Sequence, residues 1–394
     1  MDIACVVRRS FPGPGGIAMM LRSITRELAK AHHVRVWAAR IDDAPITRLN
    51  ATLGAQVFSP QWVDGVEVRP VPMNLGALAA STPMALMTVP GLRSKGYQVL
   101  RRATAPGFVR SVAARLAAEW DGVEVVHAWG GEHLNWAAGH AARRSGRPLV
   151  VTPFAHPDAW GDDPLNVRFY RTAHIVCALL PSEAAFYARL GVDEAKLRVV
   201  GVPVSHQPPP DPTVQTGEGP LVLYLGVKEP YKGYRTLLQA APLVWREVPD
   251  ARFAFVGPRT EESIQDFAVM DDQRIIEVGR VPDEQVVAWQ QACTVFCLPS
   301  TSEIMPVSIL EAWHHRKPVV AARWWCANDL IDDGTDGAVV DGDGEQVARA
   351  LIALLRDEAA ARAMGEAGRA KVEQRYTPEA VTARHLAAYE AALG

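Results

Sequence analysis

The chain has 394 residues, of which 48% are apolar and 22% are charged, and its formal net charge is −3. This length exceeds what a single hydrophobic core usually supports, so two domains are expected. Because the charges nearly cancel, the chain as a whole has no net positive charge that would attract nucleic acid. Any anion-binding site must therefore be local. No run approaches the ~20 apolar residues that span a bilayer, which leaves at most peripheral membrane contact.

The cysteines are scattered and form no Cys-x-x-Cys pair, which is typical of a reduced protein. They are Cys5, Cys177, Cys293, Cys297 and Cys326. At the amino terminus, only a short apolar run precedes two arginines, so the segment lacks the features of a signal peptide. A cytoplasmic location is therefore expected. Nothing in the sequence indicates an oligomeric state.

In the first half of the chain, short apolar runs rich in β-branched residues alternate with segments of helical period. The predicted strands are Asp2–Val7, Val34–Ala39, Val66–Val71, Val123–Ala128, Leu149–Phe154, His174–Leu180 and Leu197–Val204. The predicted helices are Gly16–Ala31, Gly107–Trp120 and Leu134–Ser145. This alternation predicts an α/β domain over residues 1–205, with helices covering a parallel sheet.

A proline-rich, polar segment at 206–220 is predicted to be an interdomain linker, and the alternation restarts after it. The second set of strands is Leu221–Gly226, Arg252–Gly257, Thr294–Pro299, Pro318–Ala322 and Gly337–Val340, with helices at Gly233–Glu247, Pro282–Gln291 and Val307–His315. A second doubly wound domain is thus predicted over 221–376. A closing helix at 377–394, with Thr377 as its cap and Pro378 in its first turn, could cross back to the first domain.

Two carboxylates, Glu303 and Glu311, lie eight residues apart around a predicted helix start at Pro306. The backbone N–H groups of Met305 to Ser308 would be unpaired there, and together with the helix dipole they would attract a diphosphate. Glu303 would then lie near the group that is attached to the distal phosphate. An ordinary capped helix with exposed glutamates explains the spacing equally well.

Lysines follow the strand Leu221–Gly226, where cations at a strand end suit a diphosphate. Lys232 precedes a glycine that opens a helix, and Lys228 lies earlier in the same loop. A solvated lysine loop is the alternative. The glycines Gly15 and Gly16, after the first strand, would let main-chain N–H groups face phosphate or sugar, although a tight turn explains them as well.

His127 lies at the carboxyl end of a predicted strand and is a candidate for contacting a sugar, with His133 and His156 as alternatives. A structural role inside the fold is the other interpretation. Asp341 and Asp343 resemble a metal-binding carboxylate pair, but their position after a strand and before a helix predicts a turn and a helix cap. No His and Cys cluster indicates zinc.

Together these motifs resemble the retaining glycosyltransferases of family 4, which have the GT-B fold of two Rossmann-like domains facing across a cleft. The resemblance implies that Glu303 holds sugar hydroxyls, that Glu311 holds the nucleotide ribose and that Lys232 neutralises the diphosphate. It further assigns donor-binding positions to Gly15, Gly16, Gly257, Arg280, Val281, Met305, Pro306 and Val307, and a sugar contact to His127. The sequence departs from the family at Val227, where arginine is usual and Lys228 is the candidate substitute, and at Ile304-Met305, where Gly-Phe is usual.

The resemblance implies a metal-independent, retaining hexosyl or other glycosyl transfer without a cofactor. The donor would be a nucleotide diphosphate sugar, with a UDP-sugar expected, and the acceptor a natural product, saccharide or lipid. Acceptor recognition is expected in the segment 73–106, where the resemblance is weak. Two alternatives fit the same pattern, namely a nucleotide-sugar binding protein without transferase activity and a GT-B epimerase or phosphorylase.

Overall fold

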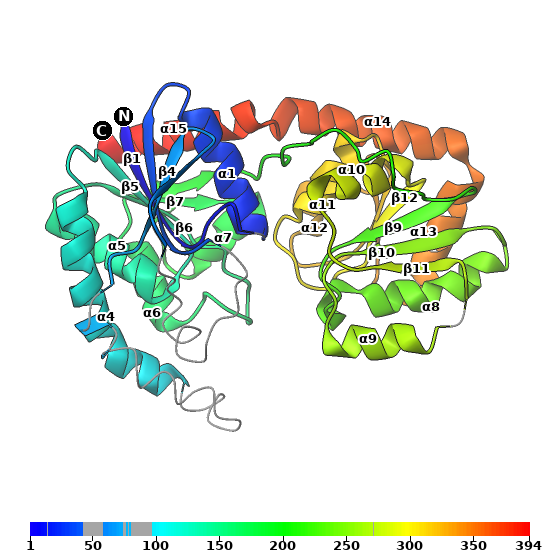
Figure 1. The fold of residues 1–394 in the computed structure, drawn as a ribbon, viewed down its shortest axis with the longest axis horizontal. Coiled ribbons are helices and arrows are strands. Elements are labelled where there is room, and N and C mark those ends of the chain that lie inside the picture. The colour runs from blue at the N-terminus through cyan, green and yellow to red at the C-terminus, as the bar shows by residue number, and fades with distance from the viewer. Residues whose placement is uncertain (14, 42–57, 74–75, 78, 80–96, 271) are drawn as a thin grey trace. The chain divides into compact units, whose positions relative to one another are not determined.

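The computed structural model describes residues 1–13, 15–41, 58–73, 76–77, 79, 97–270 and 272–394. The chain forms two compact units, the first comprising Met1–Gly201 and Val381–Gly394 and the second comprising Val202–Ala380. Each unit contains its own largely parallel sheet with helices packed against it (Figure 1). The predicted class, two doubly wound α/β domains, is confirmed.

The sheet of the first unit has the strand order β3-β4-β2-β1-β5-β6-β7-β8. These strands are β1 (Asp2–Arg9), β2 (His33–Arg40), β3 (Gln61–Val63), β4 (Val66–Pro70), β5 (Val125–Trp129), β6 (Leu149–Thr152), β7 (Ile175–Ala178) and β8 (Leu197–Val199). Neighbours are parallel except for β3 and β4 at one edge. Every residue of β5, β6 and β7 is buried, as expected for strands covered on both faces.

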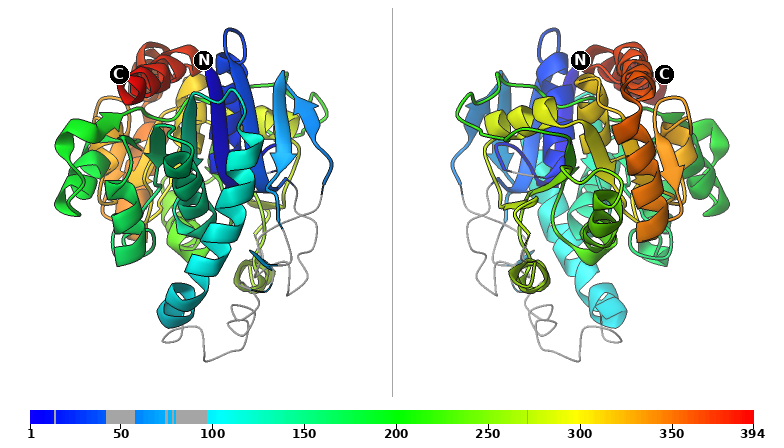
Figure 2. Two further views of the ribbon diagram at one scale, coloured as in Figure 1. Left: turned by 90° about the vertical axis from the view of Figure 1, so that its left-hand side faces the viewer. Right: turned by 90° about the vertical axis from the view of Figure 1, so that its right-hand side faces the viewer.

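Helices cover both faces of this sheet. They are α1 (Gly16–Leu28), α4 (Tyr97–Glu119), α5 (Glu132–Arg144), α6 (Pro164–Arg171), α7 (Pro181–Arg189) and the greater part of α15 (Pro378–Leu393). On one face, Val6 and Ala128 share a core with Val112 of α4 and Ala138 of α5, and these two helices lie side by side (Figure 2). The opposite face of β5 contacts α15, where the His127 ring forms a hydrogen bond with the Tyr389 hydroxyl.

The second unit has six parallel strands in the order β11-β10-β9-β12-β13-β14. They are β9 (Leu221–Leu225), β10 (Arg252–Val256), β11 (Ile275–Val278), β12 (Val295–Leu298), β13 (Val319–Ala322) and β14 (Ala338–Val340). The helices are α8 (Tyr234–Trp245), α9 (Glu261–Ala268), α10 (Asp283–Ala292), α11 (Val307–His314), α12 (Ala327–Leu330), α13 (Gly344–Arg356) and α14 (Glu358–Arg375). The strand order reverses between β9 and β12, and the loops after these two strands therefore meet at a topological switch point.

Several boundaries differ from the sequence-based prediction. The edge strands β3 and β11 were not predicted, and the helix predicted from Gly107 begins at Tyr97 and includes Pro106. The segment 206–220 belongs to the second unit, where the Asp211 amide donates to the Glu284 carbonyl at 3.0 Å. Helix α15 begins at Pro378 as predicted. Most of the segment 73–106, where acceptor recognition is expected, lies outside the described residues.

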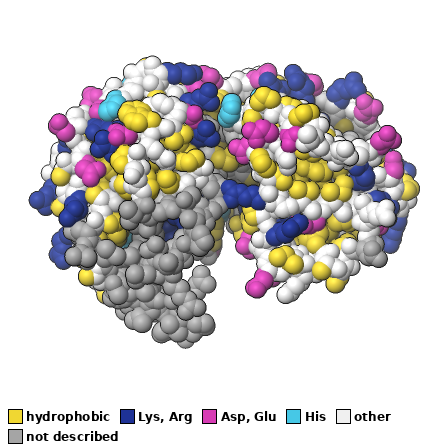
Figure 3. Space-filling model, in the orientation of Figure 1, with side chains coloured by type: hydrophobic (Ala, Val, Ile, Leu, Met, Phe, Trp, Pro, Cys, Tyr) yellow, Lys and Arg dark blue, Asp and Glu magenta, His cyan; other side chains and the backbone are white. Residues whose placement is uncertain are grey.

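Within the described part of the chain, no helix combines the length and the apolar character needed to cross a bilayer. On the faces drawn in Figure 3, acidic and basic side chains are interspersed over each unit. This mixture agrees with the small net charge of the chain. Concentrations of one sign must therefore be sought at individual sites.

Candidate functional site

The switch point of the second unit brings together the two loops that carry the strongest sequence motifs. After β9, the chain passes through a single 3-10 turn at Pro230–Lys232 and enters α8 at Tyr234. After β12, residues 299–306 lead into α11. The amide of Thr301 and the hydroxyl of Ser300 both donate to the Tyr231 carbonyl, at 2.9 and 3.1 Å. These bonds join the two loops directly.

Gly233 is essential to this junction. Its φ is 79°, in the left-handed region that favours glycine. A Cβ atom at this position would also lie 1.9 Å from the carbonyl oxygen of Pro299, which leaves no room for any side chain. Glycine therefore both ends the 3-10 turn and lets the loop after β12 approach it.

The junction places Lys232 beside Glu303. The ammonium Nζ of Lys232 lies 2.6 Å from Glu303 Oε1, and the two side chains are 21% and 8% exposed. A charge-assisted bond of this length is among the stronger contacts in proteins. Two residues that the sequence predicts as functional, 71 positions apart, are thus brought into one site with limited access to water.

The start of α11 lies directly after this ion pair in the chain. Met305 and Pro306 are buried, and α11 begins at Val307 with Pro306 as its N-cap. The thiol of Cys326 donates to the Ile304 carbonyl at 3.3 Å and so helps to fix the loop. The first N–H groups of a helix lack intrahelical partners and carry its positive dipole end. This helix start is therefore suited to an anion.

Glu311 lies one turn further along α11 and is also buried. It accepts hydrogen bonds from the Ser205 hydroxyl and from Gln290 Nε2, the latter at 2.9 Å. Burial raises the pKa of the Glu311 carboxyl, against the effect of these two donors. The carboxylate is thus held by hydroxyl and amide donors, which are the kinds of group that ribose hydroxyls would replace. Its role in binding ribose stays a prediction.

Lys228 does not lie free in the loop after β9. Its ammonium is fully buried and donates to the carbonyls of Gly257 and Val278 at 2.6 and 2.7 Å. It also lies 2.8 Å from Glu277, which Arg259 contacts at 2.7 Å on its other oxygen. Burial lowers the pKa of Lys228 despite this carboxylate. The structure therefore corrects the prediction that Lys228 replaces the family arginine, because its donors are used to join strand ends.

The turns predicted to flank the nucleotide base follow β10 and β11. Gly257, at the end of β10, has φ 135°, and a Cβ there would lie 2.2 Å from the Gly226 carbonyl oxygen. The strand ends of β9 and β10 are therefore packed backbone to backbone. Arg280 and Val281 lie between β11 and α10, where Arg280 is exposed and Val281 half-buried. Their contact with a base stays a prediction.

In the first unit, Gly15 and Gly16 open α1 after β1. Gly15 has φ 119°, which favours glycine, whereas a Cβ on either residue would meet no heavy atom within 4 Å. Packing among the residues that the structure describes therefore does not require glycine at Gly16. The open space beside both residues is compatible with close approach of a ligand, which stays a prediction.

His127 is a core residue, and the prediction that it contacts a sugar is corrected by the structure. Its ring has no exposed surface. Nδ1 lies 2.8 Å from the Tyr389 hydroxyl, and Nε2 lies 2.8 Å from Thr152 Oγ1. Burial lowers the pKa of the ring well below its usual range. A buried, neutral histidine with both nitrogens hydrogen-bonded cannot reach a ligand. The burial of β5 on both faces was therefore a better guide to the role of His127 than its position near the carboxyl end of the strand.

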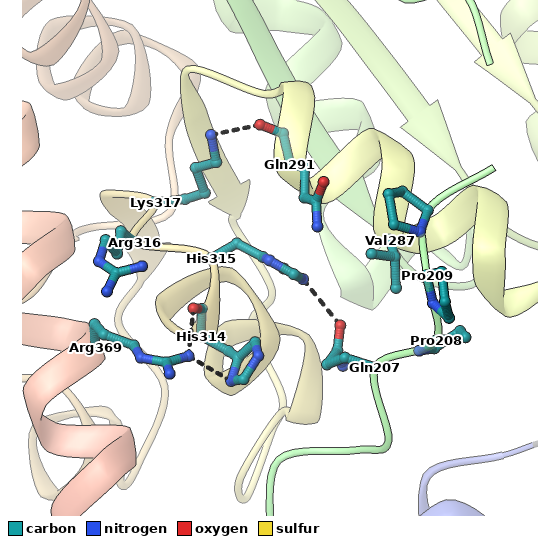
Figure 4. A pocket seen from close by; sticks show the side chains of 11 residues that line it. Gln207, Pro208, Pro209, Val287, Gln291, His314, His315, Arg316, Lys317 and Arg369 are labelled. Atoms are coloured by element: carbon teal, nitrogen blue, oxygen red, sulfur yellow. Dashed lines mark hydrogen bonds between the residues drawn. The ribbon is translucent and has the colours of Figure 1, made fainter. Parts of the chain in front are cut away.

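A second group of basic residues lines a cavity of about 530 Å³ near the carboxyl end of α11 (Figure 4). Arg369 donates to the His314 carbonyl at 2.7 Å, and Lys317 Nζ donates to the Gln291 carbonyl at 2.6 Å. His315 Nε2 lies 2.9 Å from Gln207 Oε1. Because a helix carboxyl end is the negative end of its dipole, these cations complement α11 itself. The anion site is better placed at the other end of the helix.

Asp341 and Asp343 behave as a turn and cap, as predicted, since Asp343 accepts from the Gln346 amide at 2.7 Å at the start of α13. The described residues contain no cluster of three His, Cys, Asp or Glu side chains arranged to hold a metal ion. Ser205, Gln290 and Cys326 also hold the residues of this site, although the sequence did not predict a role for them. Polar residues of this kind carry no recognisable spacing, so only the fold reveals that they hold the site.

Comparisons with known proteins agree with this architecture. Residues 15–203 match a family model described as "Glycosyl transferase 4-like domain", and residues 219–357 match one described as "Glycosyl transferases group 1". The chain is 30% identical over 317 residues to the GDP-mannose-dependent alpha-(1-6)-phosphatidylinositol monomannoside mannosyltransferase of Mycolicibacterium smegmatis. This match covers 70% of the chain and 79% of the relative.

Two solved structures show the same fold at low sequence identity. Anabaena HepE in complex with UDP and glucose has a TM-score of 0.70 and 17% identity, and the match covers 99% of each chain. Sucrose-phosphate synthase from Thermosynechococcus elongatus also has a TM-score of 0.70, with 18% identity and coverage of 99% of this chain and 98% of that one.

Proposed function

This chain belongs to the group 1 glycosyltransferases of family 4 and has their GT-B fold, and from this premise we propose that it transfers mannose from GDP-mannose with retention of configuration. The acceptor in this proposal is a hydroxyl of a phosphatidylinositol-type glycolipid. The observation that carries the proposal is the Lys232–Glu303 ion pair, 2.6 Å long, at the switch point of the second unit.

The donor is assigned from the relative that is 30% identical over most of this chain, because its name gives GDP-mannose as the donor and a phosphatidylinositol monomannoside as the acceptor. The sequence alone led us to expect a UDP-sugar. HepE, which was solved with UDP and glucose, shares the fold at only 17% identity and therefore carries less weight for the choice of base. Both donors have a diphosphate that the same site would bind.

In the proposed mechanism, the start of α11 and Lys232 bind the diphosphate. The N–H groups of Val307 and Ser308 at the start of α11 are fixed in direction by the helix, so they need not reorganise as negative charge develops on the leaving group. Lys232 adds a full positive charge. This fixed positive charge would stabilise the departing diphosphate without a divalent ion, and Glu303, beside Lys232, would hold hydroxyls of the transferred sugar.

The nucleoside is proposed to lie along the neighbouring strand ends. Glu311 would exchange its Ser205 and Gln290 donors for the two ribose hydroxyls, which offer equivalent hydrogen bonds. Gly257, Arg280 and Val281 would flank the base. Retention of configuration is proposed from family membership, with a phosphate oxygen of the donor accepting the proton of the incoming hydroxyl.

The proposal is tested by incubating the enzyme with GDP-mannose or UDP-glucose and a phosphatidylinositol mannoside, with proton NMR of the anomeric centre of the product. We expect an α-linked mannoside from GDP-mannose. Glu303→Gln should lower kcat at least about 100-fold, whereas Glu262→Gln, on the exposed face of α9, should leave it unchanged. Binding of the donor without transfer to any acceptor would instead support a nucleotide-sugar binding protein, and a β-linked product would refute retention.

A further inference from the structure

The first unit contains a cavity of about 450 Å³ between α4, α5 and α6. Its wall is largely apolar, formed by Ala105 and Val109 from α4, Trp136 from α5, and Leu165 and Phe169 from α6. A volume of this size falls in the range of small-molecule sites. The cavity lies in the outer helical layer of the first unit, and none of its lining residues belongs to the candidate donor site.

The packing of α5 against α6 gives this cavity a defined shape. A Cβ atom on Gly139 would lie 2.6 Å from the Phe169 ring, so glycine allows that ring to lie flush against α5. Trp136 Nε1 donates to Asn166 Oδ1 at 2.9 Å, which fixes the indole. Gly139, Asn166 and Phe169 are themselves buried. The apolar wall is thus preorganised, and its shape does not depend on flexible side chains alone.

The exposed lining residues include three arginines and a histidine, beside the uncharged Pro106 and Thr172. Arg110, Arg143 and Arg168 come from the three different helices, and the exposed His140 comes from α5, as Arg143 does. None of the described lining residues is acidic. Among the residues that the structure describes, none of the three guanidinium groups has an ion-pair or hydrogen-bond partner. Three unpaired guanidinium groups around one apolar cavity constitute a locally positive rim on a chain whose net charge is negative.

We propose that this cavity binds one acyl chain of an anionic phospholipid, whose phosphate is held by Arg110, Arg143 and Arg168. The apolar wall would remove the hydrocarbon from water, and guanidinium groups bind phosphate oxygens in a bidentate manner. Neither an uncharged hydrocarbon nor a hydrophilic anion would use both parts of the site. The inference does not rest on the proposed transferase activity, because it uses none of the donor-site residues.

The charged rim is tested by sedimenting the full-length protein with phosphatidylcholine vesicles that contain or lack phosphatidylglycerol. We expect binding only to the anionic vesicles. Arg110→Gln combined with Arg143→Gln should weaken it more than about tenfold, since each basic residue contributes about fivefold near an anionic surface. The matched control combines Arg115→Gln with Arg144→Gln, which removes the same charge from the same two helices outside the cavity. Equal losses in the two double variants would overturn the proposal.

Insertion of the acyl chain is tested separately with phosphatidylglycerol that is brominated along its chains. Bromine quenches nearby indoles, and Trp136 lines the cavity. The brominated lipid should therefore quench part of the tryptophan fluorescence of the wild-type protein, and this part should be missing in Trp136→Phe. Vesicle binding with no Trp136-dependent quenching would show that the lipid stays outside the cavity and would refute the proposal.

Discussion

Gly233 and Pro299 are in backbone contact, so that a Cβ atom on Gly233 would lie 1.9 Å from the Pro299 carbonyl oxygen. This contact fixes the turn that carries Lys232 against the loop that carries Glu303. The backbone of both loops, rather than the two charged side chains, therefore sets the geometry of the pair. A change at Gly233 should affect stability and activity together.

We predict that Gly233→Ala destabilises the second unit by about 3 kcal/mol, from the left-handed backbone and the overlap with Pro299. Gly334→Ala is the matched control, because Gly334 has nearly the same φ, 78°, but open space around its Cβ position. It should cost only about 1 kcal/mol. Urea unfolding of the two variants measures the difference. Equal costs would show that the close approach to Pro299 does not matter.

Lys228 is predicted to stabilise the fold. Lys228→Met would leave Glu277 and two carbonyls without their buried cation and should destabilise the protein by about 3 kcal/mol. Lys30→Met, at a lysine that is 63% exposed, should change stability very little. Adding Glu277→Gln to the Lys228 variant should recover part of the loss, which urea unfolding would detect. A stable Lys228→Met protein with weakened donor binding would instead restore the phosphate-binding interpretation.

His127 is predicted to act only through stability. His127→Asn should lower the free energy of unfolding by about 2 kcal/mol, since it disrupts bonds to Tyr389 and Thr152 in the core. The kcat of the folded enzyme should stay within about threefold of wild type. Thr152→Val disturbs the same network and should behave alike. A drop of two orders of magnitude in kcat, with folding intact, would show that the ring does reach substrate.

The buried histidines predict a loss of stability in mild acid. Burial lowers the pKa of His385 to about 4, whereas in the unfolded chain a histidine titrates near its usual ~6.5. Below this value the unfolded state binds a proton that the folded state excludes, so stability falls with falling pH. For His385 the loss is about 2 kcal/mol between pH 7 and pH 5. The variant His385→Phe keeps the stacking on Trp129 and should abolish this pH-dependent loss of stability. The control His206→Phe, at an exposed histidine, should leave the loss unchanged.

Glu183 opposes this trend over part of the same pH range. Burial raises its pKa to about 7, although Tyr187 and the Leu179 amide donate to it. Its contribution to stability is therefore lost as the pH rises from about 4.5 to 7. The comparison between His385→Phe and His206→Phe isolates the histidine effect, because both proteins retain Glu183.

The fold was predictable because the central parallel strands are buried on both faces and stand out as apolar runs. The strands that were missed are edge strands whose apolar runs are only two residues long. β3 has three residues, and β11 has four, all half-buried. The omission of β11 matters for the site, since this strand carries Glu277, the carboxylate beside Lys228.

Residues of the candidate site could be predicted only where a motif lies within one loop or helix start. Lys232 and Glu303 were identified from such local patterns. The burial of Lys228 depends on carbonyls 29 and 50 positions away, and that of His127 on Tyr389, 262 positions away. A strand end marks where a ligand can bind, but it does not show whether a side chain there points to the ligand or into the core.

The most direct test of the central claim is calorimetric binding of GDP and of guanosine to the wild type, to Lys232→Met and to the control Lys317→Met. If Lys232 binds the diphosphate, its variant should raise the Kd for GDP about tenfold or more and leave the Kd for guanosine unchanged. Lys317→Met should alter neither. An unchanged Kd for GDP in Lys232→Met would contradict the assignment of the switch point as the diphosphate site.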